Sequence, residues 1–287
     1  MNRDTQIEKA ERFRALHQGP EVLLLPNIWD SLGARLLEHL GYPAVATSSA
    51  AVAYSMGSRD GQLLPFETMC ERIARIAESV ELPVTADIEA GYAEQPEDVA
   101  RNMRRVLRAG AVGINLEDGT AEGGPLYPIE RQCARIRAVR EMAMGEGIPL
   151  FINARTDLFM DREEIACEAK LAETITRARA YREAGADCVY PILLSDREAI
   201  ARLLGETGGP LNILAMPSTP PVAELKAIGV RRLSLGSGLL REALTTMRKV
   251  AVALRDTGSY ETFTEGIIRG SEVAEIVEVA SRGRHRG

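Results

Sequence analysis

Acidic side chains stand at the ends of two neighbouring apolar segments of the chain. Asp87 and Glu89 close the segment 83–87, and Glu117 and Asp118 close the segment that follows it. If extended backbone continues through Glu89, Asp87 and Glu89 point the same way, because side chains two residues apart in a strand share a face. Carboxylates that close repel one another, so either some are protonated or a cation neutralises them.

The chemistry of such a cluster is that of a hard divalent cation. Oxygen ligands without histidine or cysteine suit Mg²⁺, with Mn²⁺ as the alternative. The competing interpretation is structural, with Asp87 capping the next helix and Glu117 paired with a surface arginine. Because four acids gather in one place, the metal site is the prediction we favour.

Two further segments offer groups that bind anions. Arg155 follows the apolar run 149–153, and a guanidinium there can hold a carboxylate or phosphonate through two hydrogen bonds. Its alternative is an ion pair with Asp157 or Glu117. Residues 47–50, Thr-Ser-Ser-Ala, combine small side chains with free backbone N–H groups, a shape that receives a carboxylate but is also common in turns.

Eight short apolar runs, alternating with amphipathic stretches of helical period, must position these groups. Four follow a glycine suited to a left-handed helix cap, and they span residues 44–47, 113–117, 188–191 and 232–236. The others span residues 21–25, 83–87, 149–153 and 211–215. Eight such strand–helix units predict an α/β fold, a closed parallel (β/α)8 barrel of the TIM type, in preference to a doubly wound open sheet. Catalytic groups of such barrels occupy the C-terminal ends of the strands.

The chain continues past the eighth strand. Residues 238–257 have a helical pattern and 261–281 supply one or two more helices. We therefore expect a barrel domain over 1–257 and a helical appendix with a basic tail over 258–287, serving an oligomer interface or covering its own barrel. Gly236-Ser237-Gly238 is typical of a phosphate-binding turn, or lets the next helix start close to the barrel.

Composition excludes several classes of protein. Apolar residues make up 45% and charged residues 26% of the chain, and no apolar run is long enough to span a membrane. The net charge of −6 gives no electrostatic footprint for nucleic acid. No secretory signal is recognisable at the N-terminus, so we expect a cytoplasmic protein. The cysteines form no C-x-x-C pair and are expected to be small buried hydrophobes, and the histidines lie on predicted helices or the tail.

With these residues in place, the chain resembles the isocitrate lyase/phosphoenolpyruvate mutase superfamily over nearly the whole barrel. The motifs that carry the resemblance are Thr47-Ser-Ser-Ala50, Ser58-Arg-Asp60-Gly61, Asp87-Ile-Glu89-Ala-Gly-Tyr92, Asn115-Leu-Glu117-Asp118 and Asn153-Ala-Arg155-Thr-Asp157. The resemblance implies that Asp87, Glu89 and Glu117 hold Mg²⁺ directly or through water, with Asp60 assisting. It also implies a homotetramer, a dimer of dimers, in which C-terminal helices are exchanged between subunits.

The resemblance assigns the substrate contacts as well. The backbone amides of Ser49 and Ala50, beside Ser48, would bind the substrate carboxylate. Arg155 would hold the far anionic group. The implied substrate-binding set is Trp29, Asp30, Ser48, Ser49, Ala50, Asp87 and Arg155.

The loop after the fourth strand departs from the family pattern. Isocitrate and methylisocitrate lyases carry Lys-[Lys/Arg]-Cys-Gly-His there, and the phosphonate enzymes carry a gating loop with lysine and asparagine. Here residues 118–128 contain no cysteine, lysine, histidine or asparagine. Glu122 and Tyr127 are the loop groups that could move protons. The predicted catalytic set is Arg155, Asp60, Glu117 and Tyr127.

These observations predict a Mg²⁺-dependent lyase that cleaves a C–C bond of a small 2-oxo or 2-hydroxy dicarboxylic acid through an enolate. Decarboxylation of oxaloacetate is compatible with this loop, because carbon dioxide leaves without a base, whereas cleavage of a 2-hydroxy acid needs a base such as Tyr127. The alternatives are phosphonopyruvate hydrolysis or mutase-type P–C chemistry, and a non-catalytic barrel that binds a metabolite.

Overall fold

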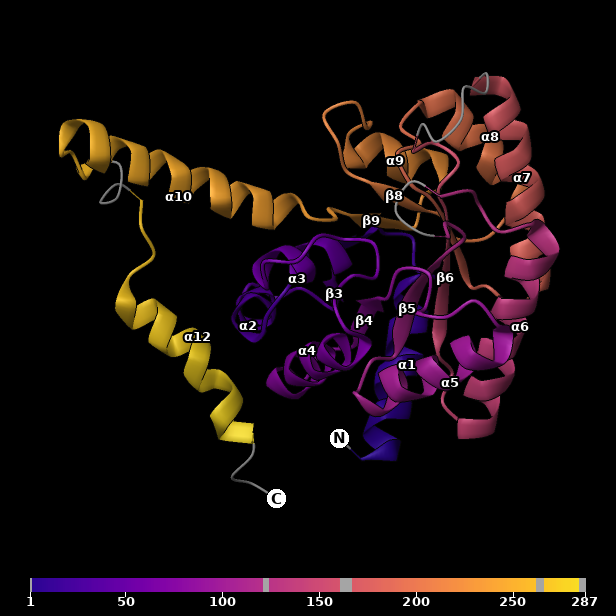
Figure 1. The fold of residues 1–287 in the computed structure, drawn as a ribbon, viewed down its shortest axis with the longest axis horizontal. Helices are drawn as coiled ribbons and strands as arrows, with labels where there is room; N and C mark the ends of the chain where they lie inside the picture. The colour runs from indigo at the N-terminus through magenta and orange to yellow at the C-terminus, as the bar shows by residue number, and fades with distance from the viewer. Residues whose placement is uncertain (1, 121–123, 161–166, 262–265, 284–287) are drawn as a thin grey trace.

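The computed structural model describes residues 2–120, 124–160, 167–261 and 266–283. Figure 1 shows a barrel of parallel strands surrounded by helices, with two C-terminal helices beside it. The strands are β1 (Leu23–Leu25), β2 (Asn27–Ile28), β3 (Val45–Thr47), β4 (Val84–Asp87), β5 (Gly113–Glu117), β6 (Phe151–Thr156), β7 (Cys188–Pro191), β8 (Asn212–Leu214) and β9 (Arg232–Ser234).

The strands close into a ring. Strands β2 to β7 pair in sequence order, β1 pairs with β9, and β9 pairs with β8, all in parallel. A bridge between Val189 and Leu211 joins β7 to the start of β8. Strands β1 and β2 succeed one another across Pro26, which completes the circle. The predicted (β/α)8 barrel is confirmed, and the open sheet is excluded.

The helices are α1 (Arg3–Leu16), α2 (Ser31–His39), α3 (Ser49–Ser55), α4 (Phe66–Ser79), α5 (Pro96–Arg108), α6 (Ile129–Glu146), α7 (Cys167–Glu183), α8 (Arg197–Thr207), α9 (Val222–Ile228), α10 (Gly238–Thr257) and α12 (Gly270–Gly283). Each of the four glycines predicted to cap a helix has a left-handed φ, between 79° and 111°: Gly41, Gly110, Gly185 and Gly229. On α5, Val99, Met103 and Val106 bury the apolar face that the sequence pattern indicates. In the part of the chain described, no helix could span a membrane.

Two details differ from the sequence expectation. The first predicted strand, 21–25, is two short strands, since the chain switches partners from β9 to β3 at Pro26. The fifth, 149–153, runs on to Thr156, so Arg155 lies within β6 and not beyond it. Among the cysteines, Cys167 is exposed at the start of α7, contrary to the expectation that all four are buried.

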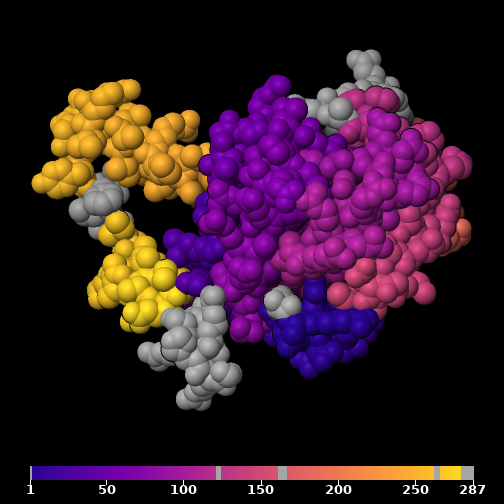
Figure 2. All heavy atoms as spheres, turned by 60° about the horizontal axis from the view of Figure 1, so that its bottom comes forward, coloured from indigo at the N-terminus to yellow at the C-terminus, as the bar shows by residue number. Residues whose placement is uncertain are grey.

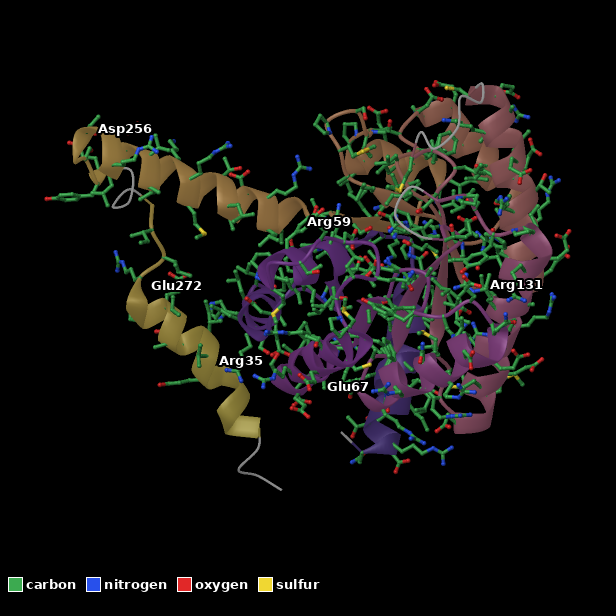
Figure 3. The ribbon with its side chains drawn as sticks, viewed as in Figure 1. Arg35, Arg59, Glu67, Arg131, Asp256 and Glu272 are labelled. Carbon is green, nitrogen blue, oxygen red and sulfur yellow. The ribbon has the colours of Figure 1, made fainter. Side chains whose placement is uncertain are left out.

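Helix α10 leaves the barrel near its first turn. Leu240 is buried, whereas Leu244 is 48% and Met247 65% exposed. Figures 1 and 2 show α10 extending away from the barrel and α12 returning towards it. Helix α12 packs on α2, where Arg35 donates to the carbonyl oxygen of Val277 at 2.6 Å (Figure 3). The domain boundary at residue 257 stays a prediction.

The Asn27 side chain forms hydrogen bonds across the place where the barrel closes. Its amide nitrogen donates to the carbonyl oxygen of Thr47 on β3 at 2.8 Å. Its amide oxygen accepts from the backbone N–H groups of Leu235 and Gly236 at 2.8 and 2.9 Å. One buried side chain therefore joins β3 to the segment after β9, where strand pairing changes partner. Because the N–H of Gly236 is committed to Asn27, this turn has one donor fewer for a phosphate.

A small aromatic cluster with a histidine closes the amino-terminal end of the barrel. His17, which follows α1, stacks on Phe151 of β6 at 3.9 Å between ring centroids and meets the edge of Phe13. Its Nδ1 bonds to the carbonyl oxygen of Phe13 at 2.9 Å, while Nε2 is buried without a partner. Burial, followed by the nearby positive charge of Arg232, lowers the pKa of His17 to about 3.

We predict that Asn27→Ala destabilises the fold by roughly 2–5 kcal/mol, because it removes three hydrogen bonds and leaves their partners unsatisfied. Urea denaturation measures this loss. The control is Asn2→Ala, which removes a single exposed cap of α1 and should cost only about 1 kcal/mol. Equal effects of the two substitutions would contradict the role assigned to Asn27.

Stability should fall as the pH drops from about 6.5 towards 3. A histidine that is neutral when folded must take up a proton on unfolding, so the unfolded state binds more protons across this window. The expected slope from His17 is about 1.4 kcal/mol per pH unit. In unfolding measurements at several pH values, His17→Phe should remove this part of the slope, whereas substitution of the exposed His39 should leave it unchanged.

Candidate functional site

Strands β4, β5 and β6 bring three of the predicted site residues to the same end of the barrel. Asp87 ends β4 opposite Asn115, and Glu117 ends β5 opposite Arg155 on β6. Asp87 and Asn115 are buried, and the side chains of Arg155 and Glu117 are 11% and 13% exposed. The parallel register therefore places the acids and the arginine together at the carboxyl ends of the strands.

One oxygen of Asp87 is held and the other is not. Its Oδ2 accepts from the backbone N–H and the hydroxyl of Ser49, at 3.1 and 2.9 Å. Its own N–H donates to the hydroxyl oxygen of Thr47 at 2.9 Å. Its Oδ1 is buried with no hydrogen-bond partner. The carboxylate is thus fixed in orientation while one acceptor stays available.

Glu89 and Asp60 lie within electrostatic reach of Asp87. Burial, then the charges of Asp60 and Asp87, raises the pKa of Glu89 to about 7. Burial, then Asp87, also raises the pKa of Asp60, whose Oδ1 is buried without a partner. The shared strand geometry expected for Asp87 and Glu89 is wrong, because β4 ends at Asp87 and Glu89 has a left-handed φ of 52°. The side chain nevertheless joins the cluster from the loop.

Arg155 is paired with two carboxylates, which is the alternative that the sequence left open. Its Nη1 lies 2.8 Å from Oε2 of Glu117. Its Nε and Nη2 donate to the two oxygens of Asp157 at 2.6 and 3.2 Å. Burial raises the pKa of Glu117 well above its usual range despite this arginine. The attraction of Glu117, Asp157 and Asp87 outweighs burial and raises the pKa of Arg155.

The donor set fits a hydrated divalent cation better than a dehydrated one. Within the described ranges no three Asp, Glu, His or Cys side chains form a ready ligand group. Yet Asp60 and Asp87 each carry a buried oxygen without a partner, and the charge of Asp87 acts on both Asp60 and Glu89. Mg²⁺ keeps several of its waters in proteins and takes only one or two carboxylates directly. The residues therefore fit Mg²⁺ bound largely through water.

Asp118 does not belong to this cluster, contrary to the expectation from sequence. Its side chain points to the opposite face from that of Glu117, as alternation along a strand requires. It is fully buried and accepts from the hydroxyl of Tyr181 at 2.7 Å, from Arg177 at 3.3 Å and from the N–H of Asp157 at 3.0 Å. Asp118 ties β5 to α7 and β6, so its role is structural.

The predicted carboxylate cradle is the start of helix α3. The hydroxyl oxygen of Ser48 caps the helix by accepting from the N–H of Ala51 at 3.3 Å. The N–H of Ser49 points to Asp87. The N–H of Ala50 lies in the first turn, where backbone donors have no acceptor within the helix. Ser48 and Ser49 thus already have partners, and Ala50 offers the amide that remains.

Of the remaining predicted residues, Trp29 and Asp30 follow β2, and Tyr127 precedes α6. Trp29 is half-buried against the main core, and Oδ1 of Asp30 caps α2 through the N–H of Gly33 at 2.8 Å. The guanidinium of Arg135 lies 4.2 Å from the ring centroid of Tyr127. Tyr127 also lines a pocket of about 320 Å³ with Gln62, Tyr92, Ala93, Glu94 and Thr120. Glu122 lies outside the described residues.

Two residues of this region, Gln62 and Arg232, were not singled out from the sequence. Gln62 contacts Glu89, as does Tyr92 at the end of the motif that begins at Asp87, and Asp157 binds Arg155, as the alternative ion pair allowed. Beneath them, Arg232 is fully buried and donates to Oδ1 of Asn115 at 3.2 Å, while its Nε and Nη1 have no partner. Burial lowers the pKa of Arg232. A charged residue in a predicted buried strand was the signal for Arg232, whereas the contacts of Gln62 depend on loop geometry that no periodicity reveals.

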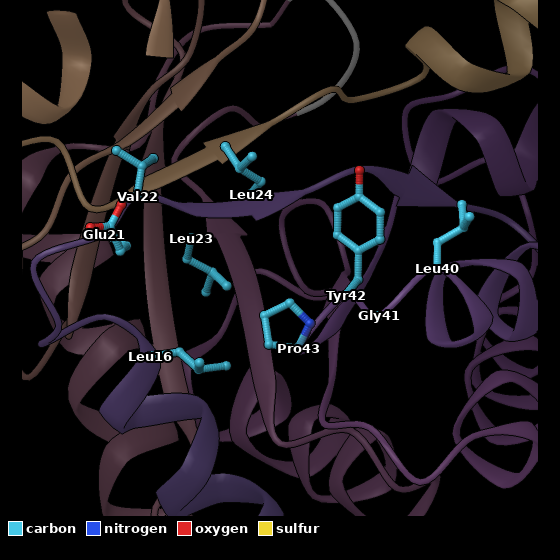
Figure 4. Close-up of a pocket in the computed structure, with 9 residues that line it drawn as sticks. All are labelled: Leu16, Glu21, Val22, Leu23, Leu24, Leu40, Gly41, Tyr42 and Pro43. Atoms are coloured by element: carbon cyan, nitrogen blue, oxygen red, sulfur yellow. The ribbon is translucent and has the colours of Figure 1, made fainter. Parts of the chain in front are cut away.

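A second hollow has no connection to this chemistry. It measures about 440 Å³ and is shown in Figure 4. It contains none of the predicted site residues, and its lining is mainly apolar: Leu16, Glu21, Val22, Leu23, Leu24, Leu40, Gly41, Tyr42 and Pro43.

Comparison with known proteins gives one consistent result. The family model described as phosphoenolpyruvate phosphomutase matches residues 13–255. An uncharacterized protein of Mycobacterium tuberculosis is 32% identical over 85% of this chain and 89% of its own length. The 2-methylisocitrate lyase of Bacillus subtilis is 27% identical over 89% of this chain and 84% of its own.

Solved structures agree. A protein from Burkholderia cenocepacia superposes with a TM-score of 0.87 at 35% identity, covering 95% of this chain and 96% of the other. Oxaloacetate acetylhydrolase, solved with its product oxalate, superposes with a TM-score of 0.83 at 26% identity and covers 97% of both chains.

Proposed function

This chain belongs to the phosphoenolpyruvate phosphomutase family, within the phosphoenolpyruvate mutase/isocitrate lyase superfamily of lyases and mutases, and we propose that it is a Mg²⁺-dependent carbon–carbon lyase. The proposed substrate is a small 2-oxo or 2-hydroxy dicarboxylic acid, with oxaloacetate as the simplest case. The observation that carries the proposal is the buried, unpartnered oxygen of Asp87 beside Asp60 and Arg155. The names of two relatives, 2-methylisocitrate lyase and oxaloacetate acetylhydrolase, refer to small carboxylic acids.

The proposed metal site consists of Asp87, Glu89 and Glu117, with Asp60 assisting, and most of their contacts to the ion would pass through water. A bound Mg²⁺, or Mn²⁺ in its place, supplies positive charge where the oxo oxygen becomes negative as the bond breaks. Ser49 fixes the orientation of Asp87 through two hydrogen bonds. The N–H of Ala50 is the proposed donor to the substrate carboxylate.

Arg155 is the proposed holder of the far anionic group. Asp157 accepts two hydrogen bonds from the guanidinium group and so fixes the orientation of its plane. The ion pair with Glu117 is therefore the contact that an incoming anion would replace. In oxaloacetate the electrons of the broken bond move towards the oxo group and carbon dioxide leaves, so no base is needed to start. Tyr127 is the proposed proton donor or acceptor for the loop, which lacks cysteine, lysine and histidine.

Purified protein should decarboxylate oxaloacetate, or cleave a related acid from a panel, only when Mg²⁺ or Mn²⁺ is present. EDTA should abolish turnover, and Asp87→Ala should lower kcat/KM by more than about 100-fold because it removes the central oxygen donors. Asp98→Asn, on the exposed surface of α5, is the control and should change nothing. Pyruvate and released phosphate are both measured.

The same panel separates the alternatives. Phosphate release from phosphonopyruvate without C–C cleavage would replace the lyase with P–C chemistry. Thermal stabilisation by the acids without any product would indicate a barrel that only binds a metabolite. Turnover that survives EDTA would contradict the metal role.

We also propose that the protein is a cytoplasmic homo-oligomer, a dimer of dimers with C-terminal helices exchanged between subunits. Helix α10 carries exposed apolar side chains along its length, among them Leu244, Met247 and Leu254. The mainly apolar hollow of Figure 4 lies beside Leu24 and Leu40, which are exposed on β1 and after α2. Apolar surface of this extent is typical of protein interfaces.

Light scattering coupled to gel filtration should give a mass near four times 31.3 kDa. Met247→Asp combined with Leu254→Asp should reduce this mass, since charges would be buried at the interface. Val222→Asp, at an exposed position on α9, is the matched control and should leave the mass unchanged. A wild-type protein that is monomeric at micromolar concentration would rule out the exchange.

A further inference from the structure

Left-handed backbone at non-glycine residues is concentrated around Glu89. Among the residues described, four non-glycine residues have a positive φ: Gln62, Glu89, Tyr92 and Leu193, at 63°, 52°, 56° and 66°. This conformation is unfavourable for residues with a Cβ and persists only where surrounding contacts enforce it. Gln62, Glu89 and Tyr92 are hydrogen-bonded to one another, although Gln62 lies in a different loop from the other two.

These contacts fix both oxygens of Glu89. Its Oε2 accepts from the backbone N–H of Gly61 at 2.8 Å and from that of Gln62. Its Oε1 accepts from the hydroxyl of Tyr92 at 3.1 Å. A carboxylate has about four positions for a hydrogen-bond donor, so three contacts leave one position free. That position is on Oε1, since Oε2 already has two donors.

Gln62 ties this arrangement together. Its side-chain oxygen accepts from the N–H of Tyr92 at 2.6 Å, and its side-chain nitrogen donates to the carbonyl oxygen of Thr120 at 3.4 Å. One residue therefore connects the loops that follow β3, β4 and β5. These are the loops that carry Asp60, Glu89 and the segment leading to Tyr127.

Glycine would have removed the strain at these positions. The chain uses it at the adjacent residues Gly61 and Gly91, whose φ values are 97° and 83°. Gln62 and Tyr92 thus carry a conformational strain that glycine would avoid. In return, the side chain of Gln62 accepts from the N–H of Tyr92, and the hydroxyl of Tyr92 donates to Glu89, contacts that glycine cannot make.

We propose that Gln62 and Tyr92 are positioning residues that clamp Glu89, so that the free position on Oε1 faces Asp60 and Asp87. This inference rests on the proposed function, in which Glu89 holds the divalent cation. The two residues contact neither substrate nor metal. They act on the ion by fixing the carboxylate that receives it or one of its waters.

The test measures binding of Mn²⁺ alone, by calorimetry or electron paramagnetic resonance, together with the melting temperature. Tyr92→Phe removes the hydroxyl, and Gln62→Gly removes the amide while suiting a left-handed φ. Each should raise the Kd for Mn²⁺ by about 10- to 100-fold, as loss of a partner of a metal ligand does. The melting temperature should stay within about 4 °C of the wild-type value.

Two comparisons decide the outcome. Tyr54→Phe removes a hydroxyl from an exposed tyrosine on α3 and should leave Mn²⁺ binding unchanged. If Glu89→Ala weakens Mn²⁺ binding while Tyr92→Phe and Gln62→Gly bind as the wild type does, the clamp is wrong and the metal role of Glu89 stands. If Glu89→Ala itself binds Mn²⁺ normally, that metal role and the clamp both fail. A large fall in melting temperature with unchanged binding would show a purely structural role and would also overturn the clamp.

Discussion

Burial of like charges at one end of the barrel is the constraint around which this structure is organised. Burial raises the pKa of Asp60, Glu89 and Glu117, and the charge of Asp87 adds to the shift of all three. Arg155 is paired directly with Glu117. Carboxylates taken out of water are stable only when charges or hydrogen-bond donors compensate them. Ser49, Gly61, Gln62 and Tyr92 supply donors, yet one oxygen of Asp60 and one of Asp87 stay without a partner. A divalent cation with its waters would complete the compensation.

Side chains that alternate along β5 place two neighbouring acids on opposite faces, where they have different roles. Glu117 faces the barrel interior and Arg155, while its neighbour Asp118 faces α7 and is satisfied by Tyr181 and Arg177. The same geometry on β6 turns Arg155 inward. The catalytic end of the barrel is thus supported by a second, fully partnered set of charges behind it.

The sequence predicted the architecture better than the environment of each side chain. The alternation of strands with helices and the glycine caps such as Gly41 were predicted correctly, because both depend on local patterns in the sequence. The split of the first strand was missed, since Pro26 marks a change of partner and not the end of pairing. Glu89 joins the cluster from the loop and not from the strand. The alternation of side chains stops at Asp87, where β4 ends, and Glu89 has a left-handed φ.

Side chains with two possible tasks were the hardest to read. Asp30 and Ser48 cap helices, a role that their sequence position also allows. Arg155 binds two carboxylates, Asp157 nearby in sequence and Glu117 on the adjacent strand, and only the folded structure shows that both pairs form together. Which of the possible partners each side chain binds depends on their distances in the folded structure, and the spacing of residues along the sequence does not give those distances.

The way the barrel closes has a consequence for the order of its assembly. Strands β2 to β7 each pair with the next strand along the chain, so this part can associate while the rest is still being synthesised. Strand β1 must wait for β9, and the amide oxygen of Asn27 must wait for N–H groups 208 and 209 residues away. Contacts so distant in sequence carry a large loop-closure entropy and form late. On the ribosome, the nascent chain therefore keeps an open edge at β1 until almost the whole barrel has emerged.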